Sequence, residues 1–403
     1  MGSRATVVRH IEPTIRFGLL AALIAAVIIY GSLYPFEFRI PTSGDGPVLT
    51  LLRSWAEPPG RGDLLANILL YIPLGWFGML SLRPRSSLGL GLVVTLIAGA
   101  CLSVTMELAQ YYDAGRVTAA DDVYANVLGT IIGSLGATIL FKKWRVPSFT
   151  ETSIDVIPVA LILAWAGYRL YPYVPTIDLH KYWAALKPVI SDPTLSLSRF
   201  YQHTTIWLTS FTLIAALVGK RRSAFLAPLF CVGILAARIV IIDIRLNTAE
   251  IAGAIAALCL WPVMLALLHR QRAAALFVLL GAAVIIERLR PFQFQPVAHD
   301  FGWVPFRSFL AGSLAVNVMA FFEKSFLYGS LLYLFTAAGG RLLTAALTLS
   351  TVLLATSWAE IYLPGRSAEI TDPVMALLIA GGFGLVRERG FTNEPGRVAR
   401  ISP

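Results

Sequence analysis

Residues 251–268 read IAGAIAALCLWPVMLALL, and this run decides the fold class. The run is apolar on every face, whereas a soluble amphipathic helix carries polar residues at every third or fourth position. A second run of this kind extends from Phe17 to Tyr30. About 20 residues cross the hydrocarbon core as a helix, and only helices and closed barrels can span lipid. Runs this long and continuous predict an all-α, multi-pass membrane protein.

The composition of the whole chain agrees with this prediction. Of its 403 residues, 57% are hydrophobic and only 14% are charged, and the mean hydropathy is +0.71. Cys101, Cys231 and Cys259 each lie inside an apolar run, without disulfide or metal-ligand spacing. The histidines are scattered as well. The sequence therefore predicts neither a metal site nor a cofactor.

The apolar runs predict about twelve transmembrane helices, near residues 14–34, 64–82, 87–110, 118–141, 154–172, 201–219, 223–243, 247–268, 273–288, 315–337, 341–361 and 368–386. Every second loop is rich in Lys and Arg, as in Lys142–Lys143–Arg145 and Lys220–Arg221–Arg222, and the basic tail falls on the same side. The positive-inside rule places that side, with both termini, in the cytoplasm. The net charge of +10 then reflects topology, and no nucleic-acid partner is needed to explain it.

The twelve helices form an internal repeat with a period of about 120 to 135 residues. A Leu-x-Pro-aromatic-type segment follows the first, fifth and ninth helices, at Leu33–Phe36, Leu170–Tyr173 and Leu289–Phe292. In the matching outer turns Arg116, Arg245 and Arg366 precede acidic residues. We therefore predict three parallel four-helix units. The predicted boundaries are 1–145, 146–270 and 271–390, followed by a cytoplasmic tail over 391–403.

The first unit resembles the VanZ-like family in two segments. The second helix carries Asp-x3-Asn followed by Pro-Leu-Gly, and a later segment carries Glu-x2-Gln, Arg, Asp and Asn-x2-Gly. The residues that carry the resemblance are Asp63, Asn67, Pro73, Gly75, Glu107, Gln110, Arg116, Asp121, Asp122, Asn126 and Gly129. The third unit keeps a degenerate form with Asn317, Glu360, Arg366 and Asp372. The middle unit keeps Arg245 and Glu250, with Arg238 near the position of Glu107.

The resemblance implies a protein of the bacterial cytoplasmic (inner) membrane. The namesake of the family is linked to low-level resistance to the glycopeptide teicoplanin. No settled biochemical activity or catalytic residue is known for the family, so the resemblance implies none for this chain.

The motif residues are spaced to meet near the outer ends of their helices. Glu107 and Gln110 share one helix face, and Asp122, Asn126 and the glycines after them form one stripe. We expect seven side chains to converge on one polar cluster, with Arg116 within reach of Glu107 or Asp122. The candidate ligand-binding residues are Asp63, Asn67, Glu107, Gln110, Arg116, Asp122 and Asn126.

Two interpretations of this cluster are open at the level of sequence. Carboxylates at a helix start, an Arg in a turn and interhelical amides can simply lock a four-helix unit. Against a lock stands the cost of intramembrane charge, roughly 2.5 to 3.5 kcal/mol at a helix centre. Arg238 and the adjacent pair Glu323 and Lys324 raise the same question. Of that pair we expect one side chain to face the bundle and the other to snorkel or to find a different partner.

Three functions agree with these residues. The first, which we favour, is a binder or transporter of a lipid-linked or cell-envelope precursor, or of a glycopeptide-related ligand, at the outer leaflet. The second is a membrane enzyme that uses Glu107 and Asp122 as general acid and base. The third is a membrane scaffold without a ligand. The sequence has no nucleophile triad, metal-ligand set or nucleotide loop, so we assign no catalytic residue.

Overall fold

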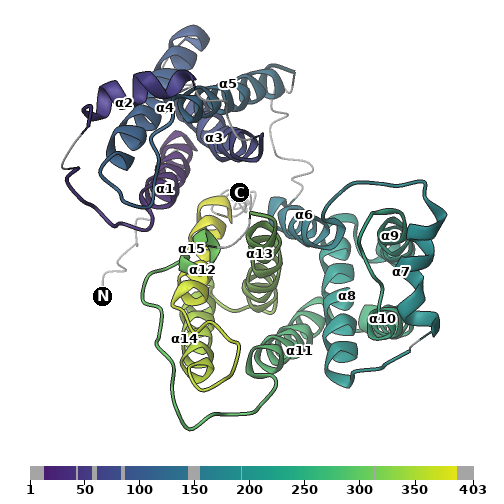
Figure 1. The fold of residues 1–403 in the computed structure, drawn as a ribbon. Helices are drawn as coiled ribbons and strands as arrows, with labels where there is room; N and C mark the ends of the chain where they lie inside the picture. The colour runs from purple at the N-terminus through teal and green to yellow at the C-terminus, as the bar shows by residue number, and fades with distance from the viewer. Residues whose placement is uncertain are drawn as a thin grey trace, which may run out of the picture. The chain divides into compact units, whose positions relative to one another are not determined.

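The computed structural model describes residues 13–41, 44–56, 61–82, 87–143, 155–191, 193–311 and 314–387. Within these ranges the chain is helical, and its only β structure consists of three isolated bridges between loops. The helices separate into two compact units, residues 1–152 and residues 153–403 (Figure 1).

The first unit contains four long helices, α1 (Pro13–Leu33), α3 (Arg61–Leu82), α4 (Leu88–Gln110) and α5 (Ala120–Lys143), with the short α2 (Pro47–Arg53) and a 3-10 turn (Ser54–Ala56) in the first loop. Helices α3 and α5 pack backbone against backbone. A Cβ atom on Gly129 would lie 2.2 Å from the Ile68 carbonyl oxygen, and one on Gly133 would lie 2.0 Å from that of Ile72. The predicted stripe on α5 therefore faces α3, and its glycines permit the close approach.

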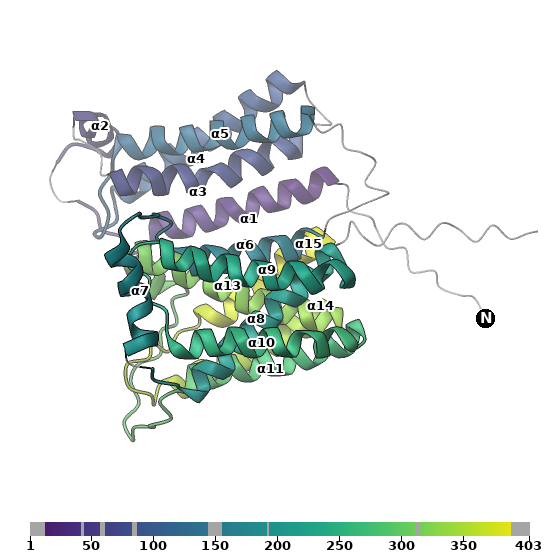
Figure 2. The ribbon, with the colours of Figure 1, turned by 90° about the vertical axis from the view of Figure 1, so that its right-hand side faces the viewer.

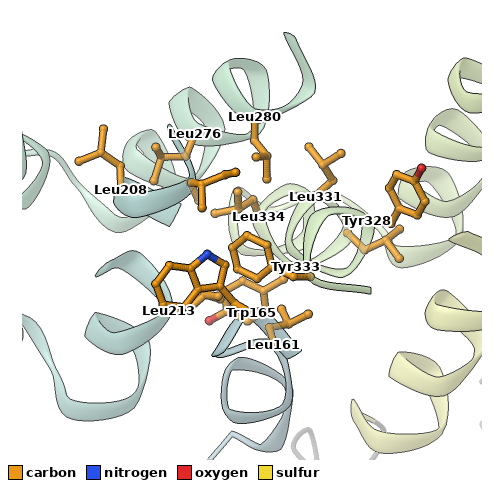
Figure 3. Close-up of a cluster of buried hydrophobic side chains, with 14 of the residues drawn as sticks. Leu161, Trp165, Leu208, Leu213, Leu276, Leu280, Tyr328, Leu331, Tyr333 and Leu334 are labelled. Atoms are coloured by element: carbon orange, nitrogen blue, oxygen red, sulfur yellow. The ribbon is translucent and has the colours of Figure 1, made fainter. Parts of the chain in front are cut away.

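The second unit contains ten helices in its described residues: α6 (Val156–Leu170), α7 (Leu179–Ser191), α8 (Leu197–Val218), α9 (Lys220–Val240), α10 (Thr248–Ala266), α11 (His269–Leu289), α12 (Arg307–Ala311), α13 (Leu314–Ala337), α14 (Leu342–Glu360) and α15 (Thr371–Arg387). The long helices of this unit run side by side (Figure 2). Its core is apolar: Trp165 of α6, Leu213 of α8, Leu276 of α11 and Leu334 of α13 are all buried and converge in one cluster (Figure 3).

Each of the twelve ranges predicted as a membrane span contains a helix. Helices α8 and α11 begin four residues before their predicted starts, and α7 was not predicted at all. Six described helices are long and apolar enough to cross a membrane, and α1, α6 and α15 include shorter apolar segments. These helices indicate a multi-pass membrane protein in a lipid bilayer. The count of twelve spans stays a prediction.

The backbone takes the same local form after α1, α6 and α11. Phe36, Tyr173 and Phe292 have φ angles of 66°, 64° and 63°. Each donates its main-chain N–H, over 2.8 Å, to the carbonyl of the leucine three residues earlier. The sequence segments singled out as repeated therefore share a turn geometry.

Each of these turns then pairs with a later loop: the loop after α4, the loop after α9 and the loop after α14, respectively. The main-chain N–H of the fourth residue after the turn proline donates to a carbonyl there: Arg39 to Tyr112 at 2.7 Å, Thr176 to Val240 at 2.9 Å and Gln295 to Tyr362 at 2.8 Å. Two residues before these acceptors stand Gln110, Arg238 and Glu360. Arg238 and Glu360 thus match Gln110 in place, and not Glu107 as we expected from the sequence.

Candidate functional site

The predicted cluster of the first unit is held largely by main-chain partners. The buried Glu107 accepts a hydrogen bond from the Ala119 main-chain N–H at 2.9 Å, across the turn between α4 and α5. Arg116 donates its Nε–H to the Tyr34 carbonyl at 2.7 Å and one terminal N–H to the Gly31 carbonyl at 2.8 Å. We expected Arg116 to form an ion pair with Glu107 or Asp122, but among the described residues it binds main-chain carbonyls. The guanidinium instead satisfies carbonyls at the end of α1, which have no partner within the helix.

Amide side chains make the remaining contacts of this cluster. Gln110 donates to the Ser32 carbonyl at 2.8 Å and so ties α4 to α1. Asn67 on α3 donates to Asp122 on α5 at 2.5 Å, and Asn126 on α5 donates to the Ser103 hydroxyl on α4 at 2.9 Å. The structure thus places Asn67 and Asp122 together, as the spacing suggests. The side chain of Asp63 lies outside the described residues.

A charged pocket of about 520 Å³ lies within the second unit. Side chains from α6, α8, α9, α10, α11, α13, α14 and α15 line it. Its basic side chains are Arg169, Arg199, Arg238, Arg288, Lys324 and Arg366, and its acidic side chains are Glu250, Glu287, Glu323, Glu360 and Asp372. Charge is costly among apolar helices and marks functional sites in membrane proteins. The pocket is therefore the strongest candidate site.

One wall of the pocket joins two arginines to a single carboxylate. Arg169 near the end of α6 is paired with Glu250 near the start of α10. The Nε of Arg238 lies 3.0 Å from the same carboxylate, and a terminal N–H of Arg238 also donates to the Arg169 carbonyl at 2.7 Å. All three side chains are at least 90% buried. Two buried guanidinium groups share one carboxylate, which leaves this group with a formal charge of +1.

The opposite wall balances its charges. Arg288 near the end of α11 is paired with both Glu360 and Asp372, at 2.8 Å for Glu360. Lys324 of α13 lies 2.7 Å from the second oxygen of Asp372. Arg288 also donates to the Ser357 hydroxyl at 2.8 Å. Two cations and two carboxylates make this group neutral.

Part of the pocket lining is apolar. Ile206 of α8, Leu280, Ala283 and Val284 of α11 and Leu327 of α13 belong to it. Along its helix, each of these residues lies farther from the helix end that carries the pocket charges than the charged residues do. The pocket therefore offers both charged and apolar lining, so that a ligand with a charged group and an apolar part can contact both.

A comparison with known families separates the two units. Residues 17–141 match a family model described as VanZ/LLP1. This segment is a VanZ-like domain. No curated protein and no solved structure matches the chain. The charged pocket lies outside the VanZ-like domain, in a part of the chain that the family model does not cover.

Sequence reasoning missed several residues of the pocket. Arg199 fell outside the predicted helix, which was expected to begin at residue 201, whereas α8 begins at Leu197. His203 fell inside that helix, but no motif marked it. Glu323 and Lys324 both line the pocket, and they have different partners, Tyr168 for Glu323 and Asp372 for Lys324. A usable signal was present: Arg169 and Arg288 each stand three residues before the proline of a repeated turn, where the VanZ-like domain has Ser32. Among the described residues, no group of three or more His, Cys, Asp or Glu side chains is placed to hold a metal ion.

Proposed function

We propose that this protein binds, and in doing so presents or transports, an anionic lipid-linked precursor of the cell envelope, and that it does so in the charged pocket of residues 153–403. The observation that carries the proposal is the pocket itself, with six basic and five acidic side chains set among apolar helices. Arginine suits this task because its planar fork pairs bidentately with phosphate and carboxylate groups.

The location that we propose is the outer side of a bacterial inner membrane, with both termini in the cytoplasm. Arg169, Arg238 and Arg288 lie near the ends of helices that, in the predicted topology, leave the cytoplasm. The basic loops that define the cytoplasmic side support this orientation. A ligand at the outer leaflet would then place its headgroup among the charges and its lipid chain along the apolar lining.

We further propose that the chain consists of three parallel four-helix units, of which the VanZ-like domain is the first. The three turns and their matching hydrogen bonds support this organisation. So does the shared role of Arg116 and Arg366, since Arg366 donates to the Arg290 carbonyl at 3.1 Å and to the Glu287 carbonyl at 2.5 Å. Both arginines bind the carbonyls one and four residues before the turn proline.

The seven-residue site predicted in the VanZ-like domain stays a second candidate for ligand binding. We rank it below the pocket because Glu107 is engaged by a main-chain N–H and Asp122 by Asn67. The same engagement weighs against an enzyme that would use these two carboxylates as acid and base. A lock between helices accounts for the contacts that are described.

Binding of defined lipids to the full-length protein in nanodiscs tests the proposal. We expect a polyprenyl phosphate to bind at least ten times more tightly than the matching neutral polyprenol, measured by native mass spectrometry and by the shift in thermal unfolding. Equal binding of the two lipids, or binding of neither, would contradict the proposed function.

A further inference from the structure

The charges of the pocket are distributed unevenly between its two walls. The wall built by α6, α8, α9 and α10 carries Arg169, Arg199 and Arg238 against Glu250, and Glu323 of α13 faces Tyr168 and Arg169 on this wall, which gives a formal charge of +1. The other wall, from α11, α13, the α14–α15 segment and α15, carries three basic side chains and three further acidic ones, which gives no net charge. An anion that enters the pocket is therefore attracted to the first wall more than to the second.

Helix α8 supplies the part of the positive wall that is free to meet a ligand. Arg199, Gln202, His203 and Ile206 are spaced i, i+3, i+4 and i+7 and all line the pocket, so they form one face. Arg199 is exposed, and among the described residues no carboxylate pairs with it. His203 lines the same pocket as Arg169, Arg199 and Arg238 and interacts electrostatically with all three.

We infer that this wall is a phosphate subsite, in which Arg199, Gln202 and His203 bind the phosphate oxygens and the buried Arg169 and Arg238 supply a fixed positive field. The inference rests on the proposed function and specifies the group that the pocket recognises. The three acceptor oxygens of a phosphate monoester can use the donors of Arg199, Gln202 and His203 together, whereas a carboxylate has only two oxygens. The side chains of α8 also offer several donors, as phosphate requires. The phosphate can belong to a lipid headgroup or to free phosphate.

The same nanodisc assay tests the inference with two matched variants. Arg199→Gln removes a charge at an exposed position of the subsite, where folding should be retained. Arg222→Gln removes an exposed charge near the other end of α9, about 24 Å along the helix from Arg238. We expect Arg199→Gln to weaken polyprenyl phosphate binding at least tenfold and to leave polyprenol binding unchanged. Arg222→Gln should bind both lipids as the wild type does.

Competition with inorganic phosphate distinguishes the two sources of the phosphate group. If inorganic phosphate displaces the lipid from the wild type but not from Arg199→Gln, the subsite accepts free phosphate. If phosphate does not displace the lipid from the wild type, binding requires the lipid as well as the phosphate group. Either result supports the subsite. Equal affinity of the wild type and Arg199→Gln for polyprenyl phosphate would overturn the inference while leaving the proposed function intact. If the wild type binds no lipid, the proposed function itself is wrong.

Discussion

The VanZ-like domain and the pocket unit (residues 153–403) carry different residues at three matching positions. The residues at these positions form hydrogen bonds between helices in the VanZ-like domain and ion pairs in the pocket unit. These junction positions lie near the end of the first helix, near the end of the third helix and near the start of the fourth helix of each four-helix segment. They are Ser32, Gln110 and Asp122 in the VanZ-like domain, Arg169, Arg238 and Glu250 in the next segment, and Arg288, Glu360 and Asp372 in the last.

The difference lies in what the residue near the end of the third helix does. In the VanZ-like domain the third-helix residue Gln110 donates to the first-helix carbonyl of Ser32. In the next segment Arg238 makes the same bond, to the Arg169 carbonyl, and has donors left for Glu250. Replacing serine and glutamine by arginine therefore keeps the helix contact and adds an ion-pair group that lines a pocket. Under the proposed function, these added charges are what the pocket offers to a ligand.

The largest expected effect comes from removing the carboxylate of the pocket unit. Glu250→Gln leaves Arg169 and Arg238 buried without their counter-charge, which typically costs about 3 to 5 kcal/mol. We expect little folded protein in membranes, measured by the monodisperse fraction after detergent extraction. Gln110→Ala, at a junction position of the VanZ-like domain, is the control, and loss of one neutral hydrogen bond should cost about 1 kcal/mol. Similar stabilities of the two variants would remove the distinction between the units.

The second-largest loss of stability is expected when the arginines of the turns are replaced. Arg116→Ala and Arg366→Ala each remove charge-assisted hydrogen bonds to carbonyls at a helix end, which contribute about 1.5 to 3 kcal/mol. Arg245 is exposed, so Arg245→Ala should change stability by less than about 0.5 kcal/mol. Thermal unfolding in detergent measures all three. An Arg116→Ala protein with unchanged stability would argue against a lock and revive the ligand site in the VanZ-like domain.

Glycine substitutions compare the packing of the two units. In Gly133→Ala the new Cβ meets the Ile72 carbonyl at 2.0 Å, and α3 and α5 must move apart, at a cost of about 1 to 3 kcal/mol. Gly233 on α9 has open space around the same position, so Gly233→Ala should gain up to about 1 kcal/mol from helix propensity. The midpoint of thermal unfolding should fall for the first variant and stay or rise for the second. A stable Gly133→Ala protein would show that the two helices are not in backbone contact.

The smallest effect is expected at the edge of the neutral wall. Lys324 is 30% exposed, and its partner Asp372 keeps the ion pair with Arg288 when Lys324 is removed. Lys324→Gln should therefore cost about 1 kcal/mol or less. Lys181→Gln removes an exposed ion pair with Asp243 on the other side of the unit and should have no measurable effect. A loss as large as that of Glu250→Gln would mean that Lys324, and not Arg288, is the main partner of Asp372.

Much of the fold followed from the sequence, because long apolar runs and repeated turn segments are local signals. Each range predicted as a membrane span contains a helix in the structure. Asn67 of α3 and Asp122 of α5, which were expected in one cluster, are in contact. The site was harder to predict, because the pocket forms between segments more than 100 residues apart in the chain, such as Arg169 and Arg288. The recognisable motif lies in the VanZ-like domain, whereas the excess charge lies at positions that depart from that motif.

The location of the bound headgroup tests the central claim most directly. We would irradiate the full-length protein in nanodiscs with a polyprenyl phosphate that carries a photoreactive group beside the phosphate, and map the modified peptides by mass spectrometry. Our account predicts modification of the first turns of α8, around Arg199 to Ile206, and its loss when unlabelled lipid is added in excess. Modification of α3 and α5 around Asn67 and Asp122 instead, with α8 unmodified, would contradict it.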